Sequence, residues 1–199
     1  MIQLQHLTIY RNHRKLLEDF SATIEKGSCV IFMGVNSSGK SSLLECLIGR
    51  LKPTRGQVLI DDRDSRFLSG KERKLLLQSS GIVFQTPSFG AYDTVSKVLS
   101  LASPEQLGAV LRHWNLLPDQ LVRDLSFTEQ RKLELERSFV NQSRLILWDE
   151  PFMGLDGASR EYFLKRLGEA KDGGATIVVF TNQSDEFSFL NPDQVVSLS

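Results

Sequence analysis

Short apolar runs alternate with longer stretches of mixed character along this chain, and the alternation is typical of an α/β protein. Continuous apolar runs occupy Cys29–Met33, Leu145–Trp148 and Thr176–Phe180, and each has the length of a strand buried on both faces of a parallel sheet. Apolar residues spaced three or four apart predict helices in three further stretches: Lys71–Gln78, residues 95–124 and the segment that follows Ser126. The pattern therefore predicts strands of a sheet joined by helices.

The first 33 residues have a more strand-like pattern, which is clearest at Ile2–Ile9. They predict an antiparallel strand set that leads into a glycine-rich loop. Another strand is expected at Gly56–Ile60 after the turn Pro53–Gly56, and a final strand at Gln194–Leu198. Because the chain ends soon after that last strand, we expect no C-terminal regulatory domain.

The glycine-rich loop has the sequence GVNSSGKSS, which matches the phosphate-binding pattern G-x-x-x-x-G-K-[ST]. A strand before the loop and a helical pattern after it are the context that this motif requires. Backbone N–H groups of such a loop surround phosphate oxygens, and the following helix adds a positive dipole. Lys40 supplies a cation for the β- and γ-phosphates, and Ser41 offers a hydroxyl to Mg²⁺. The expected nucleoside triphosphate site comprises Gly34, Val35, Asn36, Ser37, Ser38, Gly39, Lys40, Ser41 and Ser42.

Two adjacent carboxylates, Asp149 and Glu150, end the apolar run Leu145–Trp148. A buried parallel strand delivers such acids to the carboxyl edge of its sheet. The helix predicted before this strand has a clear start signal, since Ser126 and Glu129 have the spacing of a capping box.

Composition narrows the class of protein. The chain has 24 basic and 24 acidic residues, so nothing indicates a basic groove for nucleic acid. Cys29 and Cys46 are expected to be reduced, buried thiols of a cytosolic chain. No apolar stretch reaches the roughly 18–20 residues of a membrane span, and the N-terminus lacks the layout of a signal peptide. We therefore expect a soluble, cytoplasmic protein, in which any contact with a membrane must come through a partner.

Together, the glycine-rich loop and the strand that ends in two acids resemble the ATP-binding subunit of an ABC transporter. Further landmarks of that family follow in order over essentially the whole chain. Leu125-Ser126 resembles the opening of the signature motif, normally LSGGQ or LSGGE, and Arg137 matches its downstream arginine. The remaining matches are an adenine-stacking aromatic at Tyr10, the Q-loop residue Gln85, the Walker B pair Asp149 and Glu150, the D-loop at Gly154-Leu155-Asp156 and the H-loop position at Asn182.

The resemblance implies an α/β fold, namely a P-loop NTPase core with a mixed sheet and an N-terminal antiparallel β-subdomain. It also implies a short α-helical subdomain that carries the signature motif. We expect residues 1–199 to form a single ABC-type ATP-binding domain, with the helical subdomain at about residues 95–135. The sequence separation between Gln85 and Leu125 is short for the family, so we expect this subdomain to be shorter than usual. ATP and Mg²⁺ are the implied ligands.

The resemblance also assigns roles in ATP hydrolysis. Glu150 is expected to polarise the attacking water, because a general base must lie within hydrogen-bond reach of that water. Asp149, Ser41 and Gln85 are expected to organise Mg²⁺, and Gln85 can also reach the water. Tyr10 is expected to stack on adenine, although a surface tyrosine at a strand end is the alternative reading.

The signature motif departs from the family pattern. In the family, two domains face head to tail, and each nucleotide lies between one P-loop and the other domain's signature helix. Phe127 and Thr128 occupy the positions of paired glycines whose N–H groups approach the γ-phosphate. Both residues bring side chains into that space, and neither readily adopts a positive φ, so we expect a weaker clamp. The expected contacts to nucleotide are Ser126, Thr128 and Glu129, and the same residues also fit an ordinary capping box.

Asn182 is a second departure, since the family has a histidine at this position. Asparagine can donate one hydrogen bond but carries no charge, and loss of one preorganised transition-state donor costs roughly 10²–10³ in rate. In a homodimer both sites would carry both defects, whereas in a heterodimer with a complete partner each site would carry one. We therefore expect slow or asymmetric hydrolysis, with nucleotide-driven dimer closure retained.

Three functional interpretations follow, and they differ in the partner. The first is a transporter energiser that drives a membrane-embedded permease through the Gln85 loop, where Phe89, Ala91 and Tyr92 form either a docking groove or local packing. The second is a regulatory module that signals through a membrane partner without moving cargo. The segment FQTPSFGAYDTV resembles the cell-division and lipoprotein-releasing groups, while the short length resembles haem-exporter subunits. The third is a soluble relative that acts on ribosomes or DNA.

Overall fold

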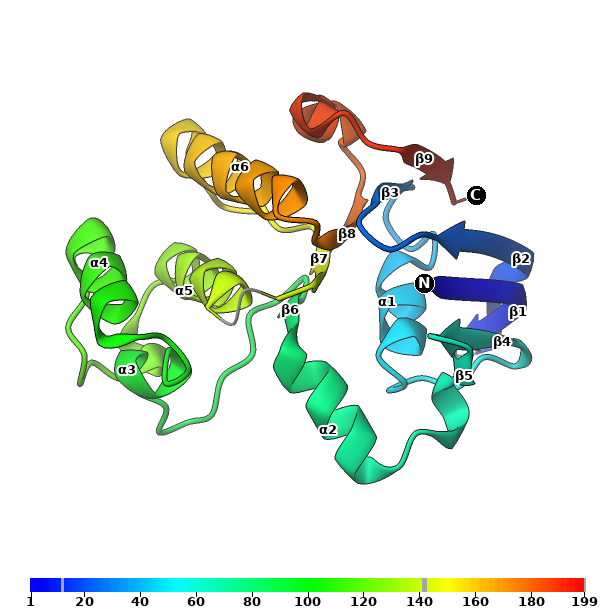
Figure 1. Cartoon of the computed structure of the whole chain (residues 1–199), viewed down its shortest axis with the longest axis horizontal. Helices are drawn as coiled ribbons and strands as arrows, with labels where there is room; N and C mark the ends of the chain where they lie inside the picture. Colours follow the sequence, from blue (N-terminus) through cyan, green and yellow to red (C-terminus); the bar gives the residue numbers. More distant parts are fainter. Residues whose placement is uncertain (12, 141–142, 199) are drawn as a thin grey trace.

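The computed structural model describes residues 1–11, 13–140 and 143–198. Its strands form two separate sheets (Figure 1). The antiparallel sheet has the order β2-β1-β4-β5 and consists of β1 (Ile2–Arg11), β2 (Arg14–Ile24), β4 (Arg55–Ile60) and β5 (Arg63–Asp64). The parallel sheet has the order β6-β7-β8-β3-β9 and consists of β3 (Cys29–Met33), β6 (Ser80–Val83), β7 (Leu145–Asp149), β8 (Thr176–Thr181) and β9 (Gln194–Ser197).

Helices cover both faces of the parallel sheet. The helix α1 (Lys40–Leu47) packs between the two sheets, and α6 (Gly157–Asp172) covers the opposite face of the parallel sheet (Figure 1). The helix α2 (Gly70–Ser79) leads into β6, and the 3₁₀ helices η1 (Ser65–Phe67) and η3 (Ser184–Leu190) lie in connections. Because the parallel strands are buried on both sides, they need the near-continuous apolar runs seen in the sequence.

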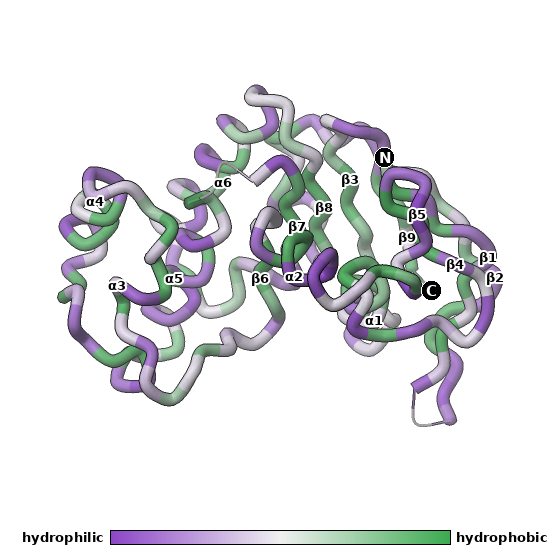
Figure 2. The backbone as a smooth tube through the Cα atoms, turned by 60° about the horizontal axis from the view of Figure 1, so that its bottom comes forward, coloured by the Kyte–Doolittle hydropathy of each residue, from purple (hydrophilic) through white to green (hydrophobic). Residues whose placement is uncertain are grey.

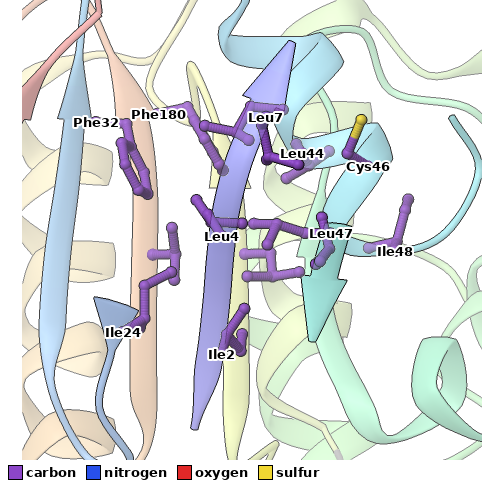
Figure 3. Packing of buried hydrophobic residues seen from close by; sticks show 14 of the residues in the cluster. Ile2, Leu4, Leu7, Ile24, Phe32, Leu44, Cys46, Leu47, Ile48 and Phe180 are labelled. Carbon is purple, nitrogen blue, oxygen red and sulfur yellow. The ribbon is translucent and has the colours of Figure 1, made fainter. Parts of the chain in front are cut away.

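The largest hydrophobic cluster joins the two sheets through α1. Figure 3 shows residues of this cluster around β1: Leu4 of β1 lies near Leu44 and Leu47 of α1, and Phe32 of β3 and Phe180 of β8 belong to the same cluster. The rings of Phe32 and Phe180 stack with their centroids 5.2 Å apart. This packing fixes α1 against the carboxyl half of the parallel strands, where the glycine-rich loop begins.

Three helices gather at the end of the molecule opposite the antiparallel sheet (Figures 1 and 2). They are α3 (Val95–Val98), α4 (Pro104–Trp114) and α5 (Phe127–Phe139), with the 3₁₀ helix η2 (Val122–Asp124) between the last two. They bury a small cluster of their own: Val95, Leu99, Val110, Leu116, Val122, Leu125 and Leu133. A capping box at Ser126 starts α5, as its spacing to Glu129 predicts, and an unpredicted capping box at Ser103 starts α4.

The expected fold class is confirmed, and the sheets refine it. The first 33 residues do not form one antiparallel set, because β3 leaves it and pairs in parallel with β8 and β9. Tyr10 lies inside β1 rather than after it, since β1 extends to Arg11. Both cysteines are free and buried, and burial raises the pKa of Cys29 to about 11 and that of Cys46 to about 12. No helix of the described residues is long and apolar enough to span a bilayer.

Candidate functional site

A cleft of about 590 Å³ lies at the carboxyl edge of the parallel sheet. One wall consists of the glycine-rich loop and the first turn of α1, with Asn36, Ser37, Gly39, Lys40, Ser41 and Ser42. The same cleft is lined by Gln85, which follows β6, and by Asp149 and Glu150, which end β7. The structure therefore brings together segments that lie far apart in the sequence, because the carboxyl ends of parallel strands meet at one edge of their sheet.

The loop backbone needs glycine at both glycine positions of its pattern. A Cβ at Gly34 would lie 2.3 Å from Ser38 Oγ and 2.9 Å from Leu198 O, which leaves no space for a side chain. Gly39 has a φ of +98° and forms the N-cap of α1, a left-handed conformation that glycine adopts at little cost. The first residues of α1, Lys40, Ser41 and Ser42, line the cleft directly after this glycine.

Lys40 connects the loop to the end of β7. Its side chain is 6% exposed, and its Nζ donates to Gly34 O at 2.6 Å and to Val35 O at 3.0 Å. The same ammonium lies 3.2 Å from Glu150 Oε1. A phosphate bound by the loop would compete with Glu150 for Lys40, because phosphate oxygens are strong acceptors for an ammonium group.

Glu150 has an unusual backbone conformation with a φ of +45°. A left-handed conformation costs a non-glycine residue roughly 1–2 kcal/mol, so the surrounding structure must hold it. The amide of Glu150 donates to Phe180 O of β8 at 2.9 Å, which fixes this turn. Glu150 Oε2 also accepts a long hydrogen bond of 3.4 Å from the Thr181 hydroxyl. The carboxylate is thus held in the cleft between Lys40 and Thr181.

Asp149 is almost completely buried beside Ser41. Its Oδ2 accepts from Ser41 Oγ at 2.5 Å, while Oδ1 has no hydrogen-bond partner among the described residues. Burial raises the pKa of the Asp149 carboxyl to about 6, and the negative charge of Glu150 adds to this, whereas the Ser41 hydrogen bond opposes it. A buried carboxylate with a free oxygen is a natural ligand for a hard cation.

The donor set around Asp149 fits magnesium bound together with phosphate. No group of three or more His, Cys, Asp and Glu side chains that could hold a metal occurs in residues 1–11, 13–140 and 143–198. The cleft instead offers the oxygens of Asp149, Ser41 and Gln85. Mg²⁺ commonly uses one or two protein oxygens and completes its shell with water and substrate phosphates.

The predicted signature residues contact their own chain rather than this cleft. Ser126 Oγ donates to Glu129 Oε2 at 2.6 Å and accepts from Glu129 N at 3.3 Å, so both residues form the capping box of α5. Thr128 Oγ1 donates to Gly154 O at 3.1 Å. The ring of Phe127 is 42% exposed, and its Cε1 would lie 3.2 Å from a Cβ at Gly154. Phe127 and Thr128 therefore bind the start of α5 to the D-loop glycine.

Asn182 is exposed and is not among the described residues that line the cleft. The residue that reaches Glu150 is the preceding one, Thr181, which is buried and ends β8. Its hydroxyl also accepts from Gln183 N at 3.1 Å. Sequence reasoning missed Thr181, although a polar residue that ends a buried strand next to β7 was an available signal.

Three further lining residues were also missed: Arg11, Arg14 and Leu16 of the β1–β2 hairpin. Arg11 Nη1 lies 3.4 Å from Glu45 Oε2 of α1, and Arg14 is exposed. Tyr10 is 47% exposed and pairs with Lys15 across the hairpin, and it is not among the described lining residues. Its stacking on adenine stays a prediction. Two arginines close to Tyr10 in the sequence were an available signal that this hairpin lies beside an anion-binding site.

Comparison with known proteins assigns this architecture. Residues 17–153 match the family model described as ABC transporter. A putative ABC transporter ATP-binding protein of Clostridium tetani is 28% identical over 88% of this chain, which spans only 42% of that protein's length. The cell division ATP-binding protein FtsE of Bacillus subtilis is 29% identical, and the match covers 93% of this chain and 87% of that protein.

A solved structure described as the dimeric structure of MJ0796, a bacterial ABC transporter cassette, superposes with a TM-score of 0.84 at 25% identity. The match covers 100% of this chain and 94% of that one. Fold, site and family model agree, so this chain belongs to the ABC transporter family. It is an ATP-binding protein and an ATPase of that class.

Proposed function

We propose that the chain binds ATP together with Mg²⁺, hydrolyses the γ-phosphate and passes the resulting movement to a membrane-embedded partner. One observation supports this above all others: Lys40, the Ser41–Asp149 pair and Glu150 converge on one cleft at the end of the parallel sheet. In this proposal, residues 1–199 act as one ATP-binding domain, with the helices at about 95–135 as its helical subdomain.

The phosphates bind to the N–H groups of the loop Gly34–Ser42 and to Lys40. When Lys40 binds the β- and γ-phosphates, its 3.2 Å contact with Glu150 Oε1 is exchanged for phosphate oxygens. Glu150 then loses its cationic partner, and its carboxylate is free to accept a hydrogen bond from water. The ion pair between Lys40 and Glu150 therefore couples nucleotide binding to preparation of the base.

Asp149, Ser41 and Gln85 would hold Mg²⁺, which neutralises charge on the β- and γ-phosphates when it is bound. Glu150 accepts the proton of the attacking water, and Thr181 orients the carboxylate through Oε2. Asn182, exposed at the mouth of the sheet edge, takes the position of the family histidine and supplies at most an uncharged hydrogen bond. Hydrolysis is consequently slow.

Tyr10 of the hairpin stacks on the adenine, while Ser126, Thr128 and Glu129 approach the nucleotide of a second ATP-binding domain. That second domain is either a copy of this chain or a different chain. The observation that favours slow or asymmetric hydrolysis is the pair of side chains at Phe127 and Thr128, which contact Gly154 of their own chain.

A groove between α2 and the helical region offers a place for the membrane partner. It has a volume of about 250 Å³, and its apolar lining includes Leu77, Ile82, Phe84, Val98 and Leu101. Phe89 packs against the helical cluster, and the guanidinium carbon of Arg137 lies 5.3 Å from the centroid of its ring. Phe89 therefore contributes to local packing. Tyr92 is 77% exposed and available to a partner. An amphipathic helix of a permease fits such an apolar groove.

A second function is favoured by the similarity to the cell division protein of Bacillus subtilis, of which this chain covers 87%. In that case the same nucleotide-driven closure signals through a membrane partner without moving cargo. The two functions share the cleft and the groove and differ only in the partner.

The test is steady-state ATP hydrolysis by the purified chain beside a Glu150→Gln variant. We expect slow, magnesium-dependent release of phosphate that the substitution reduces by roughly 10²-fold or more. ATP affinity should persist in Glu150→Gln, and an ATP-dependent shift to a dimer should be seen by size-exclusion chromatography. Vigorous turnover by the wild type would overturn the proposal of impaired hydrolysis, and equal rates in both proteins would remove Glu150 from the mechanism.

A further inference from the structure

A fully buried arginine lies in the first half of α5, outside the nucleotide cleft. Arg131 and its ion-pair partner Glu134 are both 0% exposed. A buried guanidinium is costly unless acceptors surround it, since its five N–H donors otherwise lose their contact with water. The position of those acceptors shows what the arginine holds in place.

Two of the acceptors are backbone carbonyls just beyond the end of β6. Arg131 Nη1 donates to Phe84 O at 2.5 Å, and Nη2 donates to Gln85 O. The parallel pairing of β6 with β7 ends at Val83, so both carbonyls follow the last paired residue of the strand. Arg131 thus supplies donors of the kind that a neighbouring strand supplies within a sheet.

Glu134 completes the attachment of this segment to α5. Its Oε2 lies 3.0 Å from Arg131 Nη1, and its Oε1 accepts from Phe84 N at 3.4 Å. Arg137 Nη2 lies 3.8 Å from the same Oε1. The Arg131–Glu134 pair therefore binds the N–H and the carbonyl of Phe84 and also the carbonyl of Gln85, while the two charges compensate one another.

The same arginine lies beside the start of the signature motif. Its guanidinium carbon is 5.7 Å from the centroid of the Phe127 ring. Gln85 lines the nucleotide cleft. Arg131 consequently contacts two segments. It binds the backbone of Gln85, and it lies beside Phe127, which stands at the first glycine position of the signature motif.

We propose that Arg131, held by Glu134, is a positioning residue that fixes the Gln85 backbone to α5, so that Gln85 and the signature end of α5 move together. The inference rests on the proposed function, in which Gln85 faces the metal and the attacking water. Arg131 itself is not among the described residues that line the cleft. Movement of α5 upon contact with a second domain would then displace Gln85 in the cleft, and the reverse.

Arg131→Met is the main test, and Arg166→Met is its matched control. Arg166 lies on α6, is 28% exposed, and pairs with Glu136 of α5, which is fully buried. Its loss therefore also leaves a buried carboxylate of α5 without this arginine, but it does not touch the Gln85 segment. We expect Arg131→Met to lower kcat by between about tenfold and 10²-fold while the Kd for ATP stays unchanged, because a small displacement of a positioned group is costly in rate. Arg166→Met should lower thermal stability without that separation of kcat from affinity.

Hydrogen–deuterium exchange adds a readout that does not depend on activity. Peptides that cover residues 84–92 should exchange faster in Arg131→Met than in Arg166→Met. Arg131→Lys keeps the charge but not the planar fork that spans two carbonyls and a carboxylate, so it should fold well and still show the loss of kcat. This variant decides the question if Arg131→Met does not fold.

Rates and exchange in both Arg131 variants equal to those of Arg166→Met would overturn the inference. Failure of the proposed function has a different signature: wild-type chain without hydrolysis, and ATP affinity insensitive to Lys40→Ala. The exchange comparison still tests the link between α5 and Gln85 in that case.

Discussion

The phosphate-binding part and the signature part of this molecule follow the family pattern to different degrees. In the phosphate-binding part, both glycines of the pattern are present, and Gly39, Lys40 and Ser41 line one cleft with Asp149. In the signature part, Phe127 and Thr128 stand at glycine positions, and their side chains contact Gly154 of the same chain. One part is complete, and the other is altered.

The difference shows that the two parts are subject to separate structural demands. The phosphate-binding cleft is assembled within one chain, from strand ends that the parallel sheet brings together. The signature end of α5 is expected to serve a nucleotide held by another domain, so its own fold does not depend on two glycines. Capping by Ser126 and the bond from Thr128 to Gly154 are enough to start the helix. A chain can therefore bind ATP with a full pocket and still clamp weakly.

The largest effect is expected in the complete part, at Lys40. Lys40→Ala should lower ATP affinity by about 10²-fold or more, because one charge-assisted contact to two phosphates is lost in a site of low exposure. Affinity can be measured by fluorescence titration with a labelled ATP analogue. Ser126→Ala, which changes only the altered part, should leave the affinity of the isolated chain unchanged. Unaltered ATP affinity in Lys40→Ala would remove the glycine-rich loop from the site.

In the complete part, the structure brings into one cleft residues that the sequence had grouped. Its residues are contiguous in the loop or end a buried apolar run, so local spacing and strand length place them. The hairpin residues Arg11 and Arg14 could not be placed in the same way, because pairing in the antiparallel sheet decides where that hairpin lies. The one-residue difference between Asn182 and Thr181 depends on where β8 ends, which is the least certain feature of any strand prediction.

In the altered part, the free energy of unfolding should depend on pH through the buried carboxylate of Glu134, which binds α5 to the backbone of Phe84. Burial raises the pKa of Glu134 from 4.5 to about 7, while Arg131 and Arg137 oppose the shift. Its stabilising contribution is therefore fully present below pH 4.5 and is lost as the pH rises through 7, because the unfolded chain releases the proton first. Relative to Glu134→Gln, the free energy of unfolding of the wild type should fall over this range. The expected change is about 1.4 kcal/mol for each unit of pKa difference.

Urea denaturation of both proteins at several pH values between 4.5 and 8 measures this change. Stability curves of the two proteins that run parallel across the range would contradict a raised pKa for Glu134. The sequence did not predict this buried charge, because Glu134 and Arg131 follow the polar pattern of an exposed helix face. Their burial depends on Phe84 and Gln85, which lie about fifty residues away and meet α5 only in the folded chain.

Restoring the glycines of the family pattern should make the signature part as complete as the phosphate-binding part. The double substitution Phe127→Gly and Thr128→Gly frees the space beside Gly154 and exposes the N–H groups of the α5 start. Hydrolysis at saturating ATP should rise about tenfold, since preorganised donors to the γ-phosphate contribute strongly to the rate. The double alanine variant removes the side chains without the freedom of glycine to adopt a positive φ, so it should gain less. A fall in rate in both variants would show that the bulky side chains assist the reaction.

The smallest effect is expected at Arg14, an exposed cation of the β1–β2 hairpin that lines the phosphate-binding cleft. Arg14→Ala should weaken ATP binding a few-fold, because an exposed charge contributes only on the order of 1 kcal/mol to the free energy of binding an anion. The loss should shrink as salt is raised from 50 mM to about 500 mM, because screening removes such an interaction.

Arg112→Ala on α4, at the other end of the molecule (Figure 1), removes the same charge and should leave affinity unchanged at both salt concentrations. Equal losses in the two variants would mean that the net charge of the chain matters rather than the wall of the cleft. A loss in Arg14→Ala that persists in high salt would instead indicate a direct, desolvated contact between this arginine and the nucleotide.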